Sequence, residues 1–227
     1  MLNVTARQEL MRTIVETLGV VVEEARLDFG EDGLSVRVVD PSHVAMIKMD
    51  VDSAAFDTWE VDETKLGLEM RKLKDILSLA GPGDMVELAY NDESGQATVN
   101  IGRIDLNLRP LDNTTLSPPN VPSLELPCGV TITGSDLGQA LRAARQVGDL
   151  VNLSLTADTF AVNVNGSTDS VHVEFSKDEL VAIDCGSPAR SQYSLTYLIP
   201  MTKIMQGIEN VNLRFGENFP LRITFDF

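Results

Sequence analysis

Residues 84–92 read DMVELAYND, and residues 210–218 read NVNLRFGEN. In both stretches apolar residues alternate with polar ones and lead into turn-forming residues, which is typical of an antiparallel hairpin. The two stretches are 126 residues apart. A second pair of matching stretches, GLSVRV at 33–38 and TFAVNV at 159–164, is separated by the same distance along the sequence. Two matches that share one offset predict that the chain contains the same structural unit twice.

The rest of each copy follows one order of elements. Most of it is strand-like, and only four segments have the apolar spacing of a helix. These segments are 6–18, 69–80, 134–149 and 197–209. Each copy therefore runs from strand to helix, through several strands to a second helix, and on to more strands. We predict an α+β fold with two repeated domains, each built from antiparallel sheets and two helices.

A proline-rich stretch separates the copies. Residues 111–127, LDNTTLSPPNVPSLELP, hold four of the ten prolines. Because proline disfavours helix in the residue before it, this stretch is predicted to be an extended linker between domains at 1–110 and 128–227. After Tyr90 the first copy has two more strands, whereas the second has one before Phe227. We therefore expect the natural chain to continue with a last strand and tail.

Composition predicts a globular protein without a cofactor or metal. The 227 residues are 43% hydrophobic, and no apolar run or basic leader suggests a membrane span or a secretory signal. We therefore expect a cytoplasmic protein. Cys128 and Cys185 are far apart in sequence and are expected to be ordinary free thiols. The two histidines, His43 and His172, have no metal-ligand spacing.

One stretch could suggest an enzyme. VVDPSHVAMI, residues 38–47, holds Asp40, Ser42 and His43, the residue types of a catalytic triad. Neighbouring positions on one turn do not readily form the hydrogen-bond relay that a triad needs. The sequence also lacks the common phosphate-binding loops and nucleophile elbows. An enzyme is therefore the weaker alternative.

Charge is distributed unevenly along the chain. The net charge is −16, from 18 basic and 34 acidic residues, yet the four helical segments together carry +1 and the rest −17. The basic residues of the helices are Arg7, Arg12, Arg71, Lys72, Lys74, Arg142, Arg145 and Lys203. Arg and Lys without interleaved aromatic residues suit contacts with phosphates and not with bases. The alternative is that these residues only keep the helix surfaces solvated.

Six stretches along nearly the whole chain are similar to one known family. They are DPSHVAMI (40–47), AAFDTWEVD (54–62), LKDILSLAG (73–81), VGD (147–149), LTYLIPMTK (195–203) and FPLRITF (219–225). In these stretches and their order the chain resembles the proliferating cell nuclear antigen family, the sliding clamps of archaeal and eukaryotic DNA replication. The resemblance implies a DNA-clamp fold and a homotrimeric ring, with helices on the inner face and sheets outside.

In such a ring the eight helical basic residues would face duplex DNA. Their contacts would be weak, salt-screened and independent of base sequence, so that the ring slides while encirclement retains it. The resemblance implies ring closure between residues 105–111 of one subunit and 171–176 of the next. The interface residues would be Leu106, Leu108, Arg109, Val171, Val173 and Phe175. A heteromeric checkpoint-type clamp is the alternative with the same fold, and a scaffold that never meets DNA is another.

The resemblance also implies a pocket for partner proteins on the outer face. Its residues would be Val39, His43, Val44, Met46, Pro119, Val121 and Pro220. The expected partners are a clamp loader, and DNA polymerase, flap endonuclease and DNA ligase through short motifs with a glutamine and paired aromatic residues. No membrane partner is expected, and the location would be the nucleoid or, in a eukaryote, the nucleus. His43 would then belong to a docking loop and not to a catalytic site.

Overall fold

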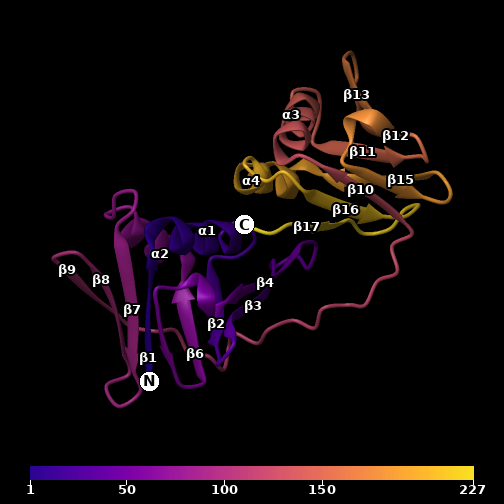
Figure 1. Cartoon of the computed structure of the whole chain (residues 1–227). Coiled ribbons are helices and arrows are strands. Elements are labelled where there is room, and N and C mark those ends of the chain that lie inside the picture. Colours follow the sequence, from indigo (N-terminus) through magenta and orange to yellow (C-terminus); the bar gives the residue numbers. More distant parts are fainter. The chain divides into compact units, whose positions relative to one another are not determined.

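The chain forms two compact units, Met1–Pro122 and Ser123–Phe227 (Figure 1). The computed structural model describes every residue from Met1 to Phe227. The boundary between the units lies inside the predicted linker of 111–127. Each unit contains two antiparallel sheets and two α-helices.

The first unit begins with a strand that runs directly into a helix. Its elements are β1 (Leu2–Arg7), α1 (Gln8–Leu18), β2 (Glu24–Phe29), β3 (Gly33–Val39), β4 (Met46–Asp52), β5 (Thr58–Val61), β6 (Thr64–Glu69), α2 (Met70–Leu77), β7 (Met85–Asn91), β8 (Gln96–Ile101) and β9 (Ile104–Leu108). One sheet has the order β5-β1-β7-β8-β9 and the other the order β4-β3-β2-β6. Apolar side chains of both sheets and of α1 and α2 form one buried core.

The second unit repeats this order. Its elements are β10 (Cys128–Ile132), α3 (Gly134–Arg145), β11 (Leu150–Leu155), β12 (Thr159–Asn165), β13 (Ser170–Ser176), β14 (Ala182–Cys185), β15 (Ala189–Ser194), α4 (Leu195–Met205), β16 (Val211–Phe215) and β17 (Arg222–Thr224). The sheets are β14-β10-β16-β17 and β13-β12-β11-β15. A second, separate cluster of apolar residues fills this core.

The predicted repeat and the α+β class are confirmed. β12 starts 126 residues after β3, at Thr159 and Gly33, and β16 starts 126 residues after β7, at Val211 and Met85. The order β5-β1-β7-β8 in the first unit corresponds strand by strand to β14-β10-β16-β17 in the second. Both copies therefore share topology as well as sequence pattern.

The helices are shorter than the sequence pattern predicted. α1 starts at Gln8 and not at residue 6, because Ala6 and Arg7 still pair with β7. The last residues of α2, α3 and α4 were predicted at 80, 149 and 209, and in the structure they are 77, 145 and 205. α4 starts two residues early, at Leu195, where the Ser194 side chain accepts a hydrogen bond from Thr196 N. Such a cap satisfies a free amide of the first turn.

The close contact of α3 with α4 depends on Gly134. Its amide donates a 2.8 Å hydrogen bond to the Ile208 carbonyl. A Cβ at this position would overlap the backbone carbonyl of Met205, so no larger residue fits. Further along α3, Gly138 lies against Thr202 of α4. The small residues of α3 thereby fix the two helices side by side.

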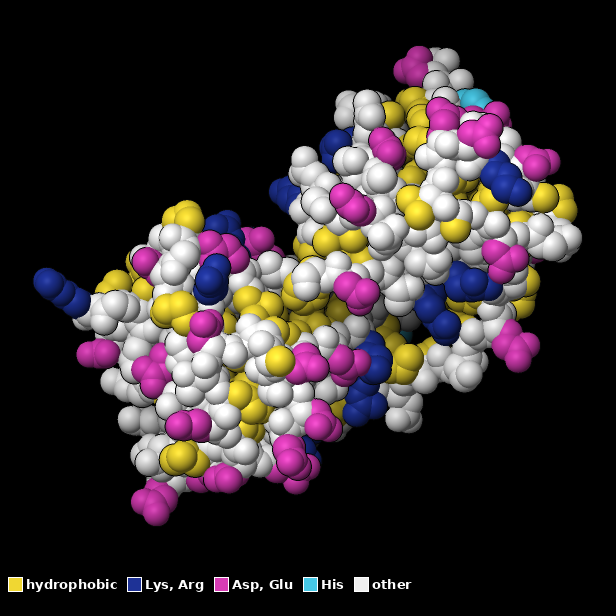
Figure 2. Space-filling model, in the orientation of Figure 1, with side chains coloured by type: hydrophobic (Ala, Val, Ile, Leu, Met, Phe, Trp, Pro, Cys, Tyr) yellow, Lys and Arg dark blue, Asp and Glu magenta, His cyan; other side chains and the backbone are white.

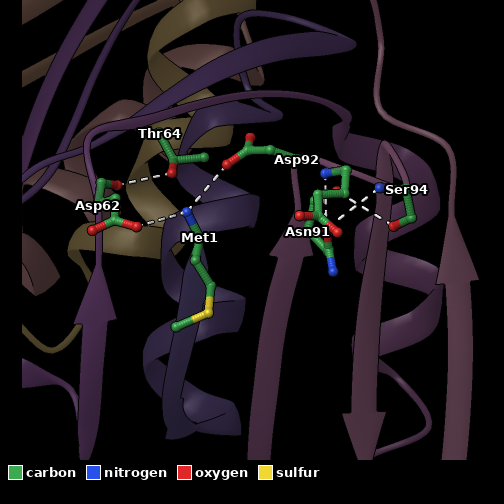
Figure 3. Close-up of polar contacts among 7 residues, drawn as sticks. Met1, Asp62, Thr64, Asn91, Asp92 and Ser94 are labelled. Carbon is green, nitrogen blue, oxygen red and sulfur yellow. Dashed lines mark hydrogen bonds and ion pairs between the residues drawn. The ribbon is translucent and has the colours of Figure 1, made fainter.

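The amino terminus is held at the end of β1 by two carboxylates (Figure 3). The Met1 ammonium donates to Asp62 Oδ2 at 3.0 Å and to Asp92 Oδ2 at 3.1 Å. Asp62 follows β5 and Asp92 follows β7, the two strands that pair with β1. The hydrogen bonds that the Met1 ammonium donates to Asp62, and then to Asp92, raise its pKa above the ordinary value. The Met1 ammonium therefore links the ends of the neighbouring strands β1, β5 and β7.

Candidate functional site: helix surfaces, a hairpin loop and two sheet edges

The helices bury one face and expose their basic residues on the other. In α1, Met11, Ile14 and Leu18 are buried, whereas Arg12 is exposed. The same division holds in the other three helices, whose buried faces are apolar. The eight predicted DNA-facing residues, Arg7, Arg12, Arg71, Lys72, Lys74, Arg142, Arg145 and Lys203, are all exposed. They are therefore available to a phosphate backbone.

Three of these cations are engaged by acidic neighbours. Glu16 Oε1 accepts from Arg12 Nε at 3.0 Å and lies 3.4 Å from Lys74 Nζ of α2. Burial opposes ionisation of Glu16, but Arg12 and Lys74 hold the pKa of its carboxyl below the usual value. Arg145 pairs with Asp149. Glu16 thus joins α1 to α2 and neutralises part of the positive charge on that face.

The other five cations form no ion pair within the chain. They are Arg7, Arg71, Lys72, Arg142 and Lys203. Acidic side chains are spread over the surface in Figure 2, in both units. Four of these cations lie on the helices and Arg7 lies at the end of β1, so in a chain of net charge −16 they give the helix surfaces local positive charge that would attract a polyanion.

The loop between β3 and β4 is built around the buried carboxylate of Asp40. This side chain is 4% exposed. Its Oδ1 accepts from Val44 N and Ala45 N, both at 2.7 Å, and its Oδ2 accepts from Ser42 N at 2.9 Å. One side chain therefore satisfies three backbone amides of a six-residue loop. Asp40 therefore organises the backbone of this loop.

His43 occupies the tip of that loop with a φ of 55°. Histidine tolerates this left-handed conformation better than most residues do. His43 and Val44 are exposed, and Val39 pairs with Met46 at the base of the hairpin. The structure thus brings together four of the predicted pocket residues on one hairpin. The loop presents an exposed valine, at 66%, to solvent.

The first part of the linker is fixed to β6. Leu111 N donates to Gly67 O at 2.9 Å, and Asn113 Nδ2 donates to the Lys65 carbonyl at 2.6 Å. A Cβ on Gly67 would meet Leu116 Cδ1 at 2.9 Å and Leu111 O at 3.0 Å. The linker therefore approaches β6 so closely that a larger residue at position 67 would force Leu116 and the Leu111 backbone to shift.

The last part of the linker is held by the second unit. Arg214 donates from Nε and Nη2 to the carbonyl of Leu126, at 3.2 and 3.0 Å. Two of the predicted pocket residues lie between the two anchored parts, the half-buried Pro119 and the exposed Val121. Pro220, the last of them, is exposed and belongs to the second unit.

The two predicted ring-closing strands are both sheet edges. β9 pairs only with β8, and β13 only with β12. The sequence stretches 105–111 and 171–176 correspond to β9 (Ile104–Leu108) and β13 (Ser170–Ser176), so Arg109 lies just beyond its strand. Leu108 is buried, and Leu106, Val171, Val173 and Phe175 are half-buried. An unpaired edge of this kind is open to a strand from another chain.

Sequence reasoning missed an apolar hollow beside β9. It is an open depression of about 420 Å³, lined by Leu79, Asp84, Met85, Ile101, Gly102, Arg103 and Ile104. Leu79 is 55% exposed, and Met85 and Ile104 are also exposed. Leu79 could have been suspected from sequence, because it follows the last buried turn of α2 and precedes a Gly-Pro pair. The hollow extends the apolar surface at one end of β9.

Comparison with known proteins places the chain in one family. A family model described as "Proliferating cell nuclear antigen, N-terminal domain" matches residues 1–104. A curated protein of Methanosarcina barkeri named "DNA polymerase sliding clamp" is 34% identical over 227 residues, covering 100% of this chain and 92% of the relative. The chain belongs to the proliferating cell nuclear antigen (PCNA) family. A sliding clamp of Halobacterium salinarum is 33% identical, over 96% of this chain and 89% of its own length.

Solved structures of PCNA have the same fold. A. fulgidus PCNA, bound to the C-terminal region of FEN-1, superimposes with a TM-score of 0.94 at 29% identity, covering 100% of this chain and 93% of that one. PCNA from Thermococcus kodakaraensis gives 0.92 at 20% identity, with 100% and 95% coverage. The predicted clamp fold is thereby confirmed over the whole chain.

Proposed function

We propose that this PCNA-family chain, a sliding clamp by family, closes into a homotrimeric ring that encircles duplex DNA. The observation that carries the proposal is the pair of free sheet edges, β9 in one unit and β13 in the other. Pairing β9 of one subunit with β13 of the next would satisfy both edges, and a closed ring leaves no such edge free. Leu106, Leu108, Val171, Val173 and Phe175 would join the apolar layers of the two sheets.

The second part of the proposal concerns DNA binding. The ring would present the exposed helical cations of each subunit to the phosphates, while the acidic sheets face solvent. Because the whole chain carries −16, attraction to DNA would be local and weak. Retention would then come from encirclement, and sliding from contacts that do not read bases. The role is one of tethering and involves no catalysis by the chain itself.

The third part concerns partners. A. fulgidus PCNA is bound to the C-terminal region of FEN-1, and it is 29% identical to this chain. We propose that the hairpin loop with His43 and Val44, together with Pro119 and Val121 of the linker, receives similar short motifs. A clamp loader, DNA polymerase, flap endonuclease and DNA ligase are the proposed users, at the nucleoid in the cytoplasm. No helix of the chain is long and apolar enough to span a membrane.

Light scattering of the purified chain tests ring closure. The proposal predicts a mass about three times 24.8 kDa at micromolar concentration. Arg109→Glu, next to β9, should shift the equilibrium toward monomer. The matched control is Glu31→Lys, a charge reversal in the turn between β2 and β3. A parent chain that stays monomeric, alone and with DNA present, would refute the homotrimer and favour the heteromeric checkpoint-type clamp.

A further inference from the structure

The two cysteines lie directly opposite each other in neighbouring strands. Cys128 of β10 and Cys185 of β14 are register partners, and their Sγ atoms are 2.7 Å apart. Residues directly opposite in antiparallel strands have Cα atoms about 4.5 to 5.5 Å apart, which is within the range that a disulfide spans. Both cysteines are free thiols, as predicted, but strand pairing brings them into contact although they are far apart in sequence.

The surroundings give the two thiols different access to solvent. Cys128 is 1% exposed, and β10 lies inside its sheet between β14 and β16. Cys185 is half-buried and belongs to β14, the edge strand of the same sheet. Both thiols also donate toward the carbonyl of Ser187, at 3.3 and 2.9 Å. An outside reagent would therefore reach Cys185 first, with Cys128 placed behind it.

We propose that Cys128 and Cys185 form a site of reversible oxidation, which closes a disulfide across β10 and β14 in the folded chain. The oxidant is a low-molecular-weight disulfide of the oxidised glutathione class. The Cys185 thiolate attacks one oxidant sulfur, the oxidant's S–S bond breaks, and one glutathione leaves. Cys128, deprotonated, then attacks Sγ of Cys185 and expels the second glutathione. Two protein thiols are oxidised, and two glutathione molecules are formed in reduced form.

The environment sets the rate of this reaction. Burial and the neighbouring Cys128 thiol raise the pKa of Cys185 to about 11. Only the thiolate attacks a disulfide, so oxidation is slow near neutral pH. Below that pKa the thiolate fraction rises about tenfold per pH unit, and the rate should rise with it. The site therefore responds to sustained oxidation and not to brief exposure.

The bond would constrain a large part of the second unit. It would enclose the chain between β10 and β14, which contains α3, β11, β12 and β13. Cross-linking two positions so distant in sequence restricts the unfolded chain. We expect the oxidised form to unfold at a temperature higher by on the order of 10 °C.

Intact-mass spectrometry of the full chain after incubation with oxidised glutathione tests the proposal. The parent should lose the mass of two hydrogen atoms and retain no glutathione, and a reducing agent should restore it. Cys128→Ser should stop at the mixed disulfide and gain one glutathionyl group on Cys185. Cys185→Ser should stay unmodified, because Cys128 is buried. Reaction from pH 7 to pH 9 should accelerate steeply.

Three results would overturn the proposal. The parent could keep both thiols under conditions in which Cys128→Ser becomes glutathionylated. It could also stop at the mixed disulfide, as that variant does. Finally, the disulfide could form only when denaturant is added, which would make it a property of the unfolded chain.

Discussion

Replacement of Asp40 offers a graded test of the loop that we propose as the partner site. The Asp40 side chain is 4% exposed. Its Oδ1 accepts hydrogen bonds from two backbone amides, and its Oδ2 accepts one from a third. Asp40→Ala removes both acceptor oxygens and with them all three hydrogen bonds. At about 1 kcal/mol for each hydrogen bond, the loss of unfolding free energy should be about 3 kcal/mol. Asp40→Asn keeps Oδ1 and should lose only about 1 kcal/mol.

Urea unfolding measures this series. With an m-value of about 1 to 3 kcal/mol/M, Asp40→Ala should lower the midpoint by roughly 1 to 3 M, and Asp40→Asn by about a third of that. The control is Asp50→Asn on the neighbouring strand, whose exposed pair with Lys48 should contribute less than about 1 kcal/mol. A peptide with a glutamine-aromatic motif should bind Asp40→Ala at least about tenfold more weakly, because the loop loses its fixed shape.

Two outcomes would refute this reasoning. Asp40→Ala could unfold within about 0.5 kcal/mol of the parent, which would mean that solvent replaces the carboxylate at no cost. Alternatively, Asp40→Asn could be as damaging as Asp40→Ala. In that case the stability of the loop would depend on the negative charge of Asp40 and not on the number of hydrogen bonds that it accepts.

The remaining predictions concern one residue each. His43→Ala should leave the fold and the oligomeric state unchanged but weaken peptide binding in a titration; unchanged binding would make His43 a turn residue only. Glu16→Gln should free Arg12 and Lys74, so that the slope of log affinity for duplex DNA against log salt becomes steeper by about one per extra phosphate contact; an unchanged slope would contradict this. The pKa of the Met1 ammonium is raised by folding, so its contribution to stability is present below pH 8 and is lost as pH rises through the raised value. Amino-terminal acetylation should therefore lower the urea midpoint at pH 7 and cease to matter at high pH, and equal midpoints at pH 7 would argue against any contribution.

The repeat could be predicted from the sequence because both copies alternate apolar and polar residues at the same offset. The pattern that begins at Gly33 recurs at Thr159, and the two stretches form β3 and β12, which are equal in length. Alternation shows which residues share a face of a strand, but it does not show which strands pair or in what register. This is why the contact of Cys128 with Cys185 was missed.

The charge pattern of the site was likewise only partly visible. Arg12 and Glu16 are four residues apart on a helix, a spacing that favours an ion pair. The approach of Lys74 to the same carboxylate depends on the packing of α2 against α1, which no local pattern contains. The hollow beside β9 also escaped prediction, because Leu79, Met85 and Ile104 come from three different segments.

The most direct test of the clamp proposal compares retention on circular and linear DNA. The protein is loaded by a clamp loader onto a nicked circular plasmid, freed of unbound protein by gel filtration, and followed before and after the plasmid is cut once. Encirclement predicts that the protein stays on the circle at high salt and is lost after linearisation, because a ring slides off a free end. Equal retention on both forms, with loss on both at high salt, would show ordinary electrostatic binding and contradict the clamp.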